Sequence, residues 1–311
     1  MVSVRGKKRR SHRLSTFIIL LLCSLFLFLF SVSLFALRDV PSVKALKHLG
    51  DRPISVIYGV NDEPCYLILP DKRITVPYKA IPAHVKEAFL AAEDAEFFKH
   101  GPLDLWGILR AAWINLKYGR VLQGGSTITQ QVIKTMVLGS ERSLLRKIKE
   151  AVLAYRLERY LSKDEILHVY LNVVYMGHGL FGIEAASQFY FGKHANELTK
   201  AEAALLAGIV QAPQRYSPKL HPGLARMRQK YVVEQMLRKG FIREREKEAI
   251  LRQRLFVRKD GGLLEEDYFK DYIVRYVEAK YGRGIFQKRS LRIYATVDPA
   301  LQRWAAEAIR R

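Results

Sequence analysis

The stretch E-D-A-E-F-F-K-H, residues 93–100, gathers acids in a chain whose formal net charge is +22. Glu93, Asp94 and Glu96 stand beside two phenylalanines and a histidine, His100. Carboxylates transfer protons in many enzymes, and apolar neighbours raise their pKa towards neutrality by desolvation. Acids at the solvated end of an amphipathic helix give the same pattern. Whether this cluster does chemistry therefore depends on what other segments bring beside it.

A second group of charges lies in E-R-S-L-L-R-K-I-K-E, residues 141–150. On a helix that turns about 100° per residue, four side chains share an arc of about 100°; they are Arg142, Arg146, Lys149 and Glu150. Cations around one acid suit a phosphate ligand, but a solvated face with i,i+4 ion pairs has the same composition. The opposite, apolar face is predicted to pack on the core; its members are Leu144, Leu145, Ile148, Val152 and Tyr155.

A third segment, Q-G-G-S-T-I-T-Q-Q-V-I-K, combines glycines with a helix start signal. Gly124 and its neighbouring glycine permit a tight turn, and Thr127 opens a capping box that begins a helix. Thr127, Gln131 and Lys134 then share one helix face. Free N–H donors and the positive dipole end suit an anionic or sugar ligand. A polar surface loop also fits these residues.

The elements that must position these groups are mostly helices. Capping boxes predict further helix starts at Ser162 and Thr199, and charged helices are expected at 242–259 and 266–280. Short β patterns occur at 54–59, 65–69 and 73–76, and a strand from Leu291 precedes a last short helix. The block I-L-H-V-Y-L-N-V-V-Y-M-G is interpreted as architectural, and His168 and His178 as structural.

The N-terminal end predicts a membrane anchor. Residues 1–13 hold six cations and no acid, and residues 14–37 carry no charge. About 20 apolar residues cross a bilayer, and flanking cations stay in the cytoplasm. We therefore expect a single-pass protein of the plasma (inner) membrane, with the remainder of the chain outside the cytoplasm. A cleaved signal peptide is the alternative, but it usually has an apolar stretch of roughly 7–15 residues and an A-x-A site.

Several classes of function are not expected from this composition. Cys23 falls inside the predicted span and Cys65 beyond it, so a disulfide between them is not expected, and neither has metal-site spacing. Strong positive charge often indicates nucleic acid, but an exported domain seldom meets any, and six cations belong to the N-terminal tail. Anionic and phosphorylated lipids are the expected partners.

Five stretches, in this order, resemble the motifs of the peptidoglycan glycosyltransferase domain (glycosyltransferase family 51). They are E-D-A-E-F-F-K-H, G-G-S-T-I-T-Q-Q, R-K-I-K-E, I-L-H-V-Y-L-N-V-V-Y-M-G and A-L-L-A-G-I-V-Q-A-P. That domain occurs in monofunctional transglycosylases and in the N-terminal half of class A penicillin-binding proteins. The resemblance covers about residues 60–240. It implies a mostly α, lysozyme-like fold with a membrane-embedded small lobe, preceded by one N-terminal transmembrane helix.

The resemblance also implies an activity, which is the polymerisation of lipid II into glycan strands. The growing lipid-linked strand is the donor, lipid II is the acceptor, and undecaprenyl pyrophosphate is released with inversion at the donor carbon. A lytic enzyme on a similar fold would have little use for the cations. A catalytically weak membrane scaffold that binds lipid II or other cell-wall synthesis proteins is the alternative.

By the matching positions, Glu93 is the general base on the acceptor 4-hydroxyl, and Glu150 is the second catalytic acid. The substrate-binding positions are Lys134, Arg142, Arg146, Lys149, Thr127, Gln131, Gly124 and Ser126. Asp94, Phe97 and His100 match positions that shape the site. No organic cofactor or bound metal is required, although Mg²⁺ or Mn²⁺ could screen the pyrophosphate.

The chain departs from the family pattern in two loops. The usual His-x-Gly after the first motif is replaced by H-G-P-L-D at 100–104, and Thr135 replaces the common Asn of the second motif. Neither change removes an acid or a cation that the mechanism needs.

The expected organisation has five parts. A cytoplasmic tail (1–13) and the anchor (14–37) precede a strand-bearing connector (38–80), the glycosyltransferase domain (81–240) and a helical extension (241–311) that resembles the start of a linker to a transpeptidase domain. The sequence contains no S-x-x-K and no K-T-G, so no transpeptidase activity is expected.

Overall fold

The computed structural model describes residues 55–68, 73–119, 124–138, 143–258 and 268–310, together with Leu20 and Ser24. The predicted tail at 1–13 and, apart from those two positions, the predicted anchor at 14–37 lie outside the described residues. Among the described residues, no helix combines the length and the apolar character needed to cross a bilayer.

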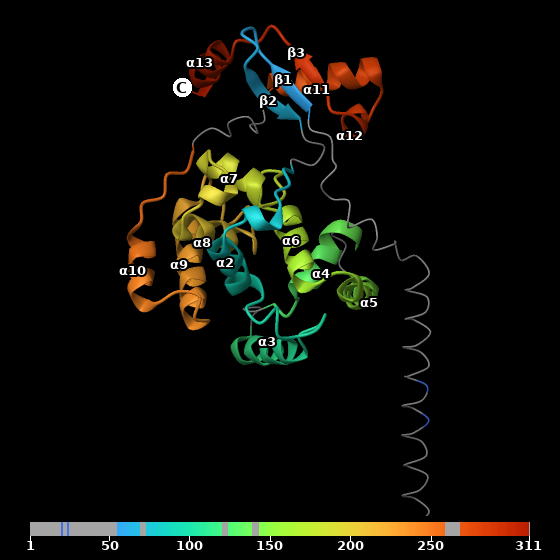
Figure 1. Ribbon diagram of the computed structural model, residues 1–311, viewed down its shortest axis with the longest axis vertical. Coiled ribbons are helices and arrows are strands. Elements are labelled where there is room, and N and C mark those ends of the chain that lie inside the picture. Colours follow the sequence, from blue (N-terminus) through green and yellow to red (C-terminus); the bar gives the residue numbers. More distant parts are fainter. Residues whose placement is uncertain are drawn as a thin grey trace, which may run out of the picture.

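The larger part of the fold is a helical body around one extensive apolar core (Figure 1). Its helices are α2 (Ala83–Glu93), α3 (Leu105–Tyr118), α4 (Ile128–Ile133), α5 (Leu144–Tyr160), α6 (Lys163–Val173), α7 (Ile183–Phe191), α8 (Lys200–Ile209), α9 (Pro222–Arg238) and α10 (Glu244–Arg252). Short helical segments are η2 (Tyr78–Ala80), η3 (Lys134–Leu138) and η4 (Ala195–Glu197). Helix α8 packs against α2 and α9, and it is buried from Ala201 to Ile209 because this stretch is apolar apart from Glu202, which pairs with Lys193.

The predicted helix starts are confirmed. Thr127, Ser162 and Thr199 are the N-caps of α4, α6 and α8, and each forms a capping box with the residue three positions on. These hydrogen bonds join residues that are close in sequence, so the local pattern suffices to specify them. Helix α10, by contrast, ends at Arg252, where the prediction extended it to residue 259.

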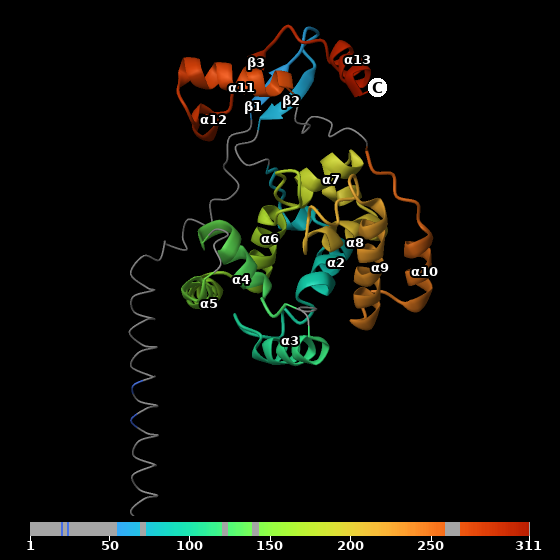
Figure 2. The ribbon, with the colours of Figure 1, turned by 180° about the vertical axis from the view of Figure 1, so that it is seen from behind.

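A second, smaller unit consists of a three-stranded sheet with helices. The strands β1 (Ser55–Tyr58), β2 (Pro64–Ile68) and β3 (Arg292–Tyr294) are arranged in the order β2-β1-β3, and α11 (Tyr268–Tyr281), α12 (Ile285–Lys288) and α13 (Pro299–Arg310) accompany them. Strand β1 pairs antiparallel with β2 and parallel with β3, which places Val56 opposite Arg292. Segments more than 200 residues apart thus share one sheet (Figure 2).

The strand predicted at 73–76 is wrong in all but its first residue. Arg73 makes a single bridge to Phe181, and residues 74–76 have no regular structure. Side chains of α6 take the backbone groups that a strand would pair: Asn172 accepts from the Val76 N–H at 2.8 Å, and the Val76 carbonyl lies 2.8 Å from Nε2 of His168. His168 therefore has the structural role that the sequence predicted.

Candidate active site

Glu93 is the last residue of α2 and lines a cavity of about 300 Å³. The Gln131 side-chain amide donates a hydrogen bond to its Oε2 at 2.8 Å. Burial raises the pKa of Glu93, and the charge of Asp94 adds to this effect. The hydrogen bond from Gln131 and the charges of Arg228 and Lys134 act in the opposite direction, but the pKa remains above the ordinary value. A carboxyl with a raised pKa in a cavity is suited to accept a proton.

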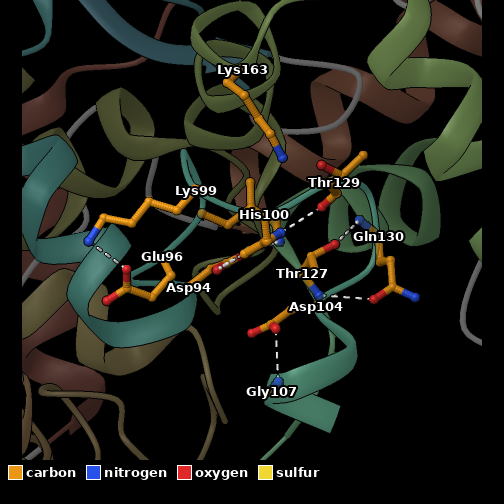
Figure 3. A network of polar contacts seen from close by, with 12 residues as sticks. Asp94, Glu96, Lys99, His100, Asp104, Gly107, Thr127, Thr129, Gln130 and Lys163 are labelled. Carbon is orange, nitrogen blue, oxygen red and sulfur yellow. Dashed lines mark hydrogen bonds and ion pairs between the residues drawn. The ribbon is translucent and has the colours of Figure 1, made fainter.

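The neighbouring carboxylate, Asp94, serves the architecture of the site. One of its oxygens accepts from the Ile128 N–H at 3.1 Å, and the other lies 2.7 Å from Nε2 of His100 (Figure 3). This hydrogen bond raises the pKa of His100. The sequence predicted free N–H donors at the start of α4 for a ligand, and this is wrong at Ile128, because a carboxylate of the protein itself binds there.

The segment before α4 holds the cavity wall in place. The Thr127 hydroxyl donates to the Pro102 carbonyl at 2.8 Å, so the altered loop at 100–104 is tied to the second motif. Residues 124–127 form no turn, contrary to the prediction. A Cβ atom on Gly125 would instead lie 3.1 Å from the Ile108 backbone, so this glycine allows the segment to approach α3. Gly124 and Ser126 also line the cavity.

The altered loop ends in a helix cap. Asp104 is the N-cap of α3 and accepts from the Gly107 N–H at 2.8 Å (Figure 3). A Cβ atom on Gly107 would lie 2.1 Å from that carboxylate, so any larger residue here would displace the capping side chain. The loop that departs from the family pattern is thus internally bonded and joined to the cavity wall.

Glu150 is buried on α5 and paired with cations. Its carboxylate forms ion pairs with Lys147 and, at 3.4 Å, with Arg146. Lys147 also donates to the Ser126 hydroxyl at 2.9 Å, which links Glu150 to the edge of the cavity. Lys147 belongs to the R-K-I-K-E motif, but a helical wheel places it away from the charged arc, and it was not among the predicted site residues.

The other cations predicted to bind the substrate differ in their surroundings. Lys134 follows α4, is exposed, and is close enough to lower the pKa of Glu93. Lys149 is half-buried on α5. Arg142 lies outside the described residues.

Helix α5 buries its charged face and exposes part of the face that was predicted to pack on the core. The face that carries Glu150 is buried, together with Leu153, Ala154 and Leu157. Of the face predicted to pack on the core, Leu145 and Tyr155 are exposed. The charged arc therefore points into the protein near the cavity, because its acid is neutralised by ion pairs there.

Phe97, in the first motif, packs in the core beside the site. Its ring is fully buried, makes an edge contact with His100 and lies under the Lys163 ammonium at 4.3 Å. Lys163 in turn pairs with Glu158, which accepts a hydrogen bond from Thr129 at 2.5 Å. Phe97 is therefore a structural residue near the site.

The sequence missed one wall of the cavity entirely. This wall belongs to α9, which contributes Arg228, Tyr231 and Gln235, and Lys239 follows at its end. The four residues recur at i, i+3, i+7 and i+11, a helical spacing that places them on one face. That spacing was the available signal, but nothing local associates it with Glu93.

Within the part of the chain that the structure describes, no group of three or more His, Cys, Asp or Glu side chains is arranged to hold a metal ion. The divalent cation considered from the sequence stays a prediction.

A comparison with protein families matches most of the helical body to one family. The transglycosylase family model matches residues 63–237, a range that includes Glu93 on α2 and the cavity-lining residues Arg228, Tyr231 and Gln235 on α9. Penicillin-binding protein 1A of Aquifex aeolicus (strain VF5) is 41% identical over 272 residues, which is 88% of this chain and 37% of that protein. Penicillin-binding protein 1A of Neisseria flavescens is 37% identical over 291 residues, or 91% of this chain and 36% of the relative.

A solved structure supports the fold. The crystal structure of penicillin-binding protein 1A from Haemophilus influenzae aligns with a TM-score of 0.50 and 22% identity, over 83% of this chain and 28% of that one. The chain thus spans little more than a third of the length of these relatives.

Proposed function

Because this chain belongs to the transglycosylase family, we propose that it is a peptidoglycan glycosyltransferase that polymerises lipid II into glycan strands. One observation carries this proposal: the Glu93 carboxyl has a raised pKa and faces a cavity with cations near it. The residue assignments and the domain boundaries given from the sequence are part of the same proposal.

Glu93 acts as the general base. It accepts the proton of the acceptor 4-hydroxyl as that oxygen attacks the anomeric carbon of the donor. The bond from this carbon to the pyrophosphate oxygen breaks, and its electron pair leaves with undecaprenyl pyrophosphate. Attack from the side opposite the leaving group inverts the anomeric carbon. Glu93 afterwards releases the proton to solvent.

The departing pyrophosphate needs stabilisation of its charge more than protonation. Lys134, Lys147 and Arg146 lie on the α4 and α5 side of the site and would supply it, and Arg142 and Lys149 are assigned to the same task. Glu150 holds Arg146 and Lys147 in position through its ion pairs. The Arg146 Nε is buried without a hydrogen-bond partner, which leaves a donor for the substrate.

Helix α3 is proposed as the membrane-embedded lobe. Its large apolar side chains are exposed, with Trp106 at 82% and Leu116 at 78%. The others are Leu105, Leu109 and Trp113. Exposure of this much apolar surface on one helix is typical of a membrane or protein contact. A lobe in the bilayer would bring the cavity to a lipid-linked substrate at the outer surface of the inner membrane.

Conversion of labelled lipid II by the detergent-solubilised protein tests the activity. We expect Glu93→Gln to lower the polymerisation rate by about 1000-fold, within the usual range for a lost general base. Glu96→Gln is the matched control: Glu96 lines the same cavity, but its pKa is lowered to about 2 by hydrogen bonds from Lys99 and Lys239. Equal losses in both variants, or lipid II binding without polymer in the wild type, would contradict the proposal and favour a scaffold.

Fluorescence in vesicles tests the membrane lobe. The chain has three tryptophans, of which Trp106 and Trp113 lie on α3 and Trp304 on α13. Lipids with brominated acyl chains should quench the wild type strongly and a Trp106→Phe/Trp113→Phe variant much less, because only the α3 rings enter the hydrocarbon. Equal quenching of the two proteins would place α3 outside the bilayer.

A further inference from the structure

The α9 wall of the cavity has the composition of a carbohydrate-binding surface. Arg228, Tyr231 and Gln235 line it on one helix face. Tyr231 is 42% exposed, so its ring can lie against the apolar face of a sugar. The Gln235 amide can both donate to and accept from hydroxyl groups. None of the sequence motifs assigned above includes these residues.

The Arg228 side chain packs between α8 and the Tyr231 ring in this wall. Its guanidinium lies 4.2 Å from the centre of the Tyr231 ring, and its Nε is buried without a hydrogen-bond partner. A Cβ atom on Gly208 of α8 would lie 3.0 Å from the Arg228 Cγ, so the glycine leaves room for the arginine side chain. A buried donor without a partner is costly unless a ligand accepts from it.

The position of α9 relative to Glu93 suggests which substrate this wall contacts. Figures 1 and 2 show α9 on one side of α2 and α4 and α5 on the other. The cations assigned to the pyrophosphate, Lys134, Arg146 and Lys147, belong to the second side. A displacement with inversion requires the nucleophile to approach from the side opposite the leaving group. The acceptor therefore has to enter from the side of α9.

We propose that Arg228, Tyr231 and Gln235 form the binding surface for the acceptor sugar of the lipid-linked substrate and hold its hydroxyl against Glu93. This inference rests on the proposed function. The ring of Tyr231 stacks on the sugar, Gln235 bonds its hydroxyl groups, and Arg228 donates to an oxygen beside the attacking hydroxyl. Lys239, which is paired with Glu96 at 2.9 Å, closes the end of the wall.

Arg228 has a second effect on the same reaction. Its positive charge favours the ionised form of Glu93 and so opposes the burial that raises the pKa of this base. Removal of the charge should therefore raise the pKa of Glu93 further. The acidic limb of the pH-rate profile then moves to higher pH, a change that a purely structural residue would not produce.

A single coupling reaction gives separate KM values for the acceptor and the donor. A lipid-linked tetrasaccharide serves as donor and lipid II as acceptor, and the concentration of each is varied while the other is held fixed. We expect Arg228→Gln and Tyr231→Leu to raise the acceptor KM by about tenfold with little change in the donor KM. Arg228→Lys should recover part of the loss and return the acidic limb towards that of the wild type.

Lys230→Gln is the matched control, because it removes one exposed positive charge from the same helix outside the cavity lining. Its acceptor KM should equal that of the wild type, and thermal melting should show that all variants are folded. An unchanged acceptor KM in Arg228→Gln, or a rise confined to the donor KM, would overturn the proposal.

Binding without turnover separates this inference from the proposed function. If the wild type makes no polymer, the binding of lipid II in detergent is compared between the wild type and Arg228→Gln. Weaker binding by the variant supports the α9 surface although the polymerase assignment fails. Equal binding of lipid II by the two proteins would overturn the proposal that α9 forms the acceptor surface.

Discussion

Two regions of this protein each contain a glutamate, and the two glutamates have opposite surroundings. Glu93 ends α2 with one neutral hydrogen-bond donor, the Gln131 amide, and burial raises its pKa. Glu150 lies on α5 in direct contact with the cations of Lys147 and Arg146. A carboxylate without a cation in contact is ready to take a proton, whereas one with two cations organises positive charge for a ligand.

This difference shows why the count of acids in a motif is a poor guide to chemistry. Glu93, Asp94 and Glu96 are neighbours in sequence, but Asp94 binds the start of α4 and Glu96 binds two lysines. Glu93 forms neither of these contacts; its pKa is raised and it lines the cavity. The partners of each carboxylate decide its role.

The largest effect on this comparison is expected from Glu150→Gln. The substitution replaces a buried negative charge with a neutral amide whose NH2 group cannot accept, so Arg146 and Lys147 lose their ion pairs and the free energy of unfolding should fall by about 2 kcal/mol. The two cations would also lose their positions, and polymerisation should fall by about 100-fold, as for other lost electrostatic contacts. Denaturant unfolding and the lipid II assay measure the two effects.

Lys147→Gln provides the matched control for that change. It removes one partner of Glu150 and the contact to Ser126, but Arg146 still pairs with the carboxylate. We expect a smaller loss of stability than in Glu150→Gln. If Glu150→Gln unfolds at the wild-type denaturant concentration, the contrast between the two glutamates is wrong.

A smaller effect of opposite sign is expected for the stability of Glu93→Gln. Because the pKa of Glu93 is raised in the folded state, the protonated carboxyl favours folding below its ordinary pKa of 4.5. This contribution is lost as the pH rises through the folded-state pKa. The amide stays neutral and avoids the cost of burying a charge, so the variant should be more stable than the wild type near neutral pH and similar at low pH.

Thermal or denaturant unfolding of both proteins across that pH range measures the difference. Glu96→Gln should instead be less stable than the wild type near neutral pH and similar to it at low pH. The pKa of Glu96 is lowered to about 2, so its ion pairs with lysines stabilise the fold at neutral pH and are lost as the pH falls towards that value. A Glu93→Gln variant that is less stable than the wild type at neutral pH would show that ionised Glu93 is stabilised by its surroundings.

The small sheet shows the limit of prediction from local patterns. Strands were expected at 54–59, at 65–69 and from Leu291, and strands are present at 55–58, 64–68 and 292–294. The parallel pairing of β1 with β3, however, joins residues such as Val56 and Arg292. An alternating pattern gives a strand but not its partner, because pairing depends on which surfaces the rest of the fold leaves open.

The sequence by itself determined the helix starts, the family and the candidate base. Capping boxes at Thr127, Ser162 and Thr199 join residues three positions apart, so they need no other part of the chain. Only the tertiary structure decided that the charged face of α5 turns inward and that Arg228 stands near Glu93. These contacts join distant segments, and their energies depend on burial and on neighbouring charges that exist only once the helices have packed.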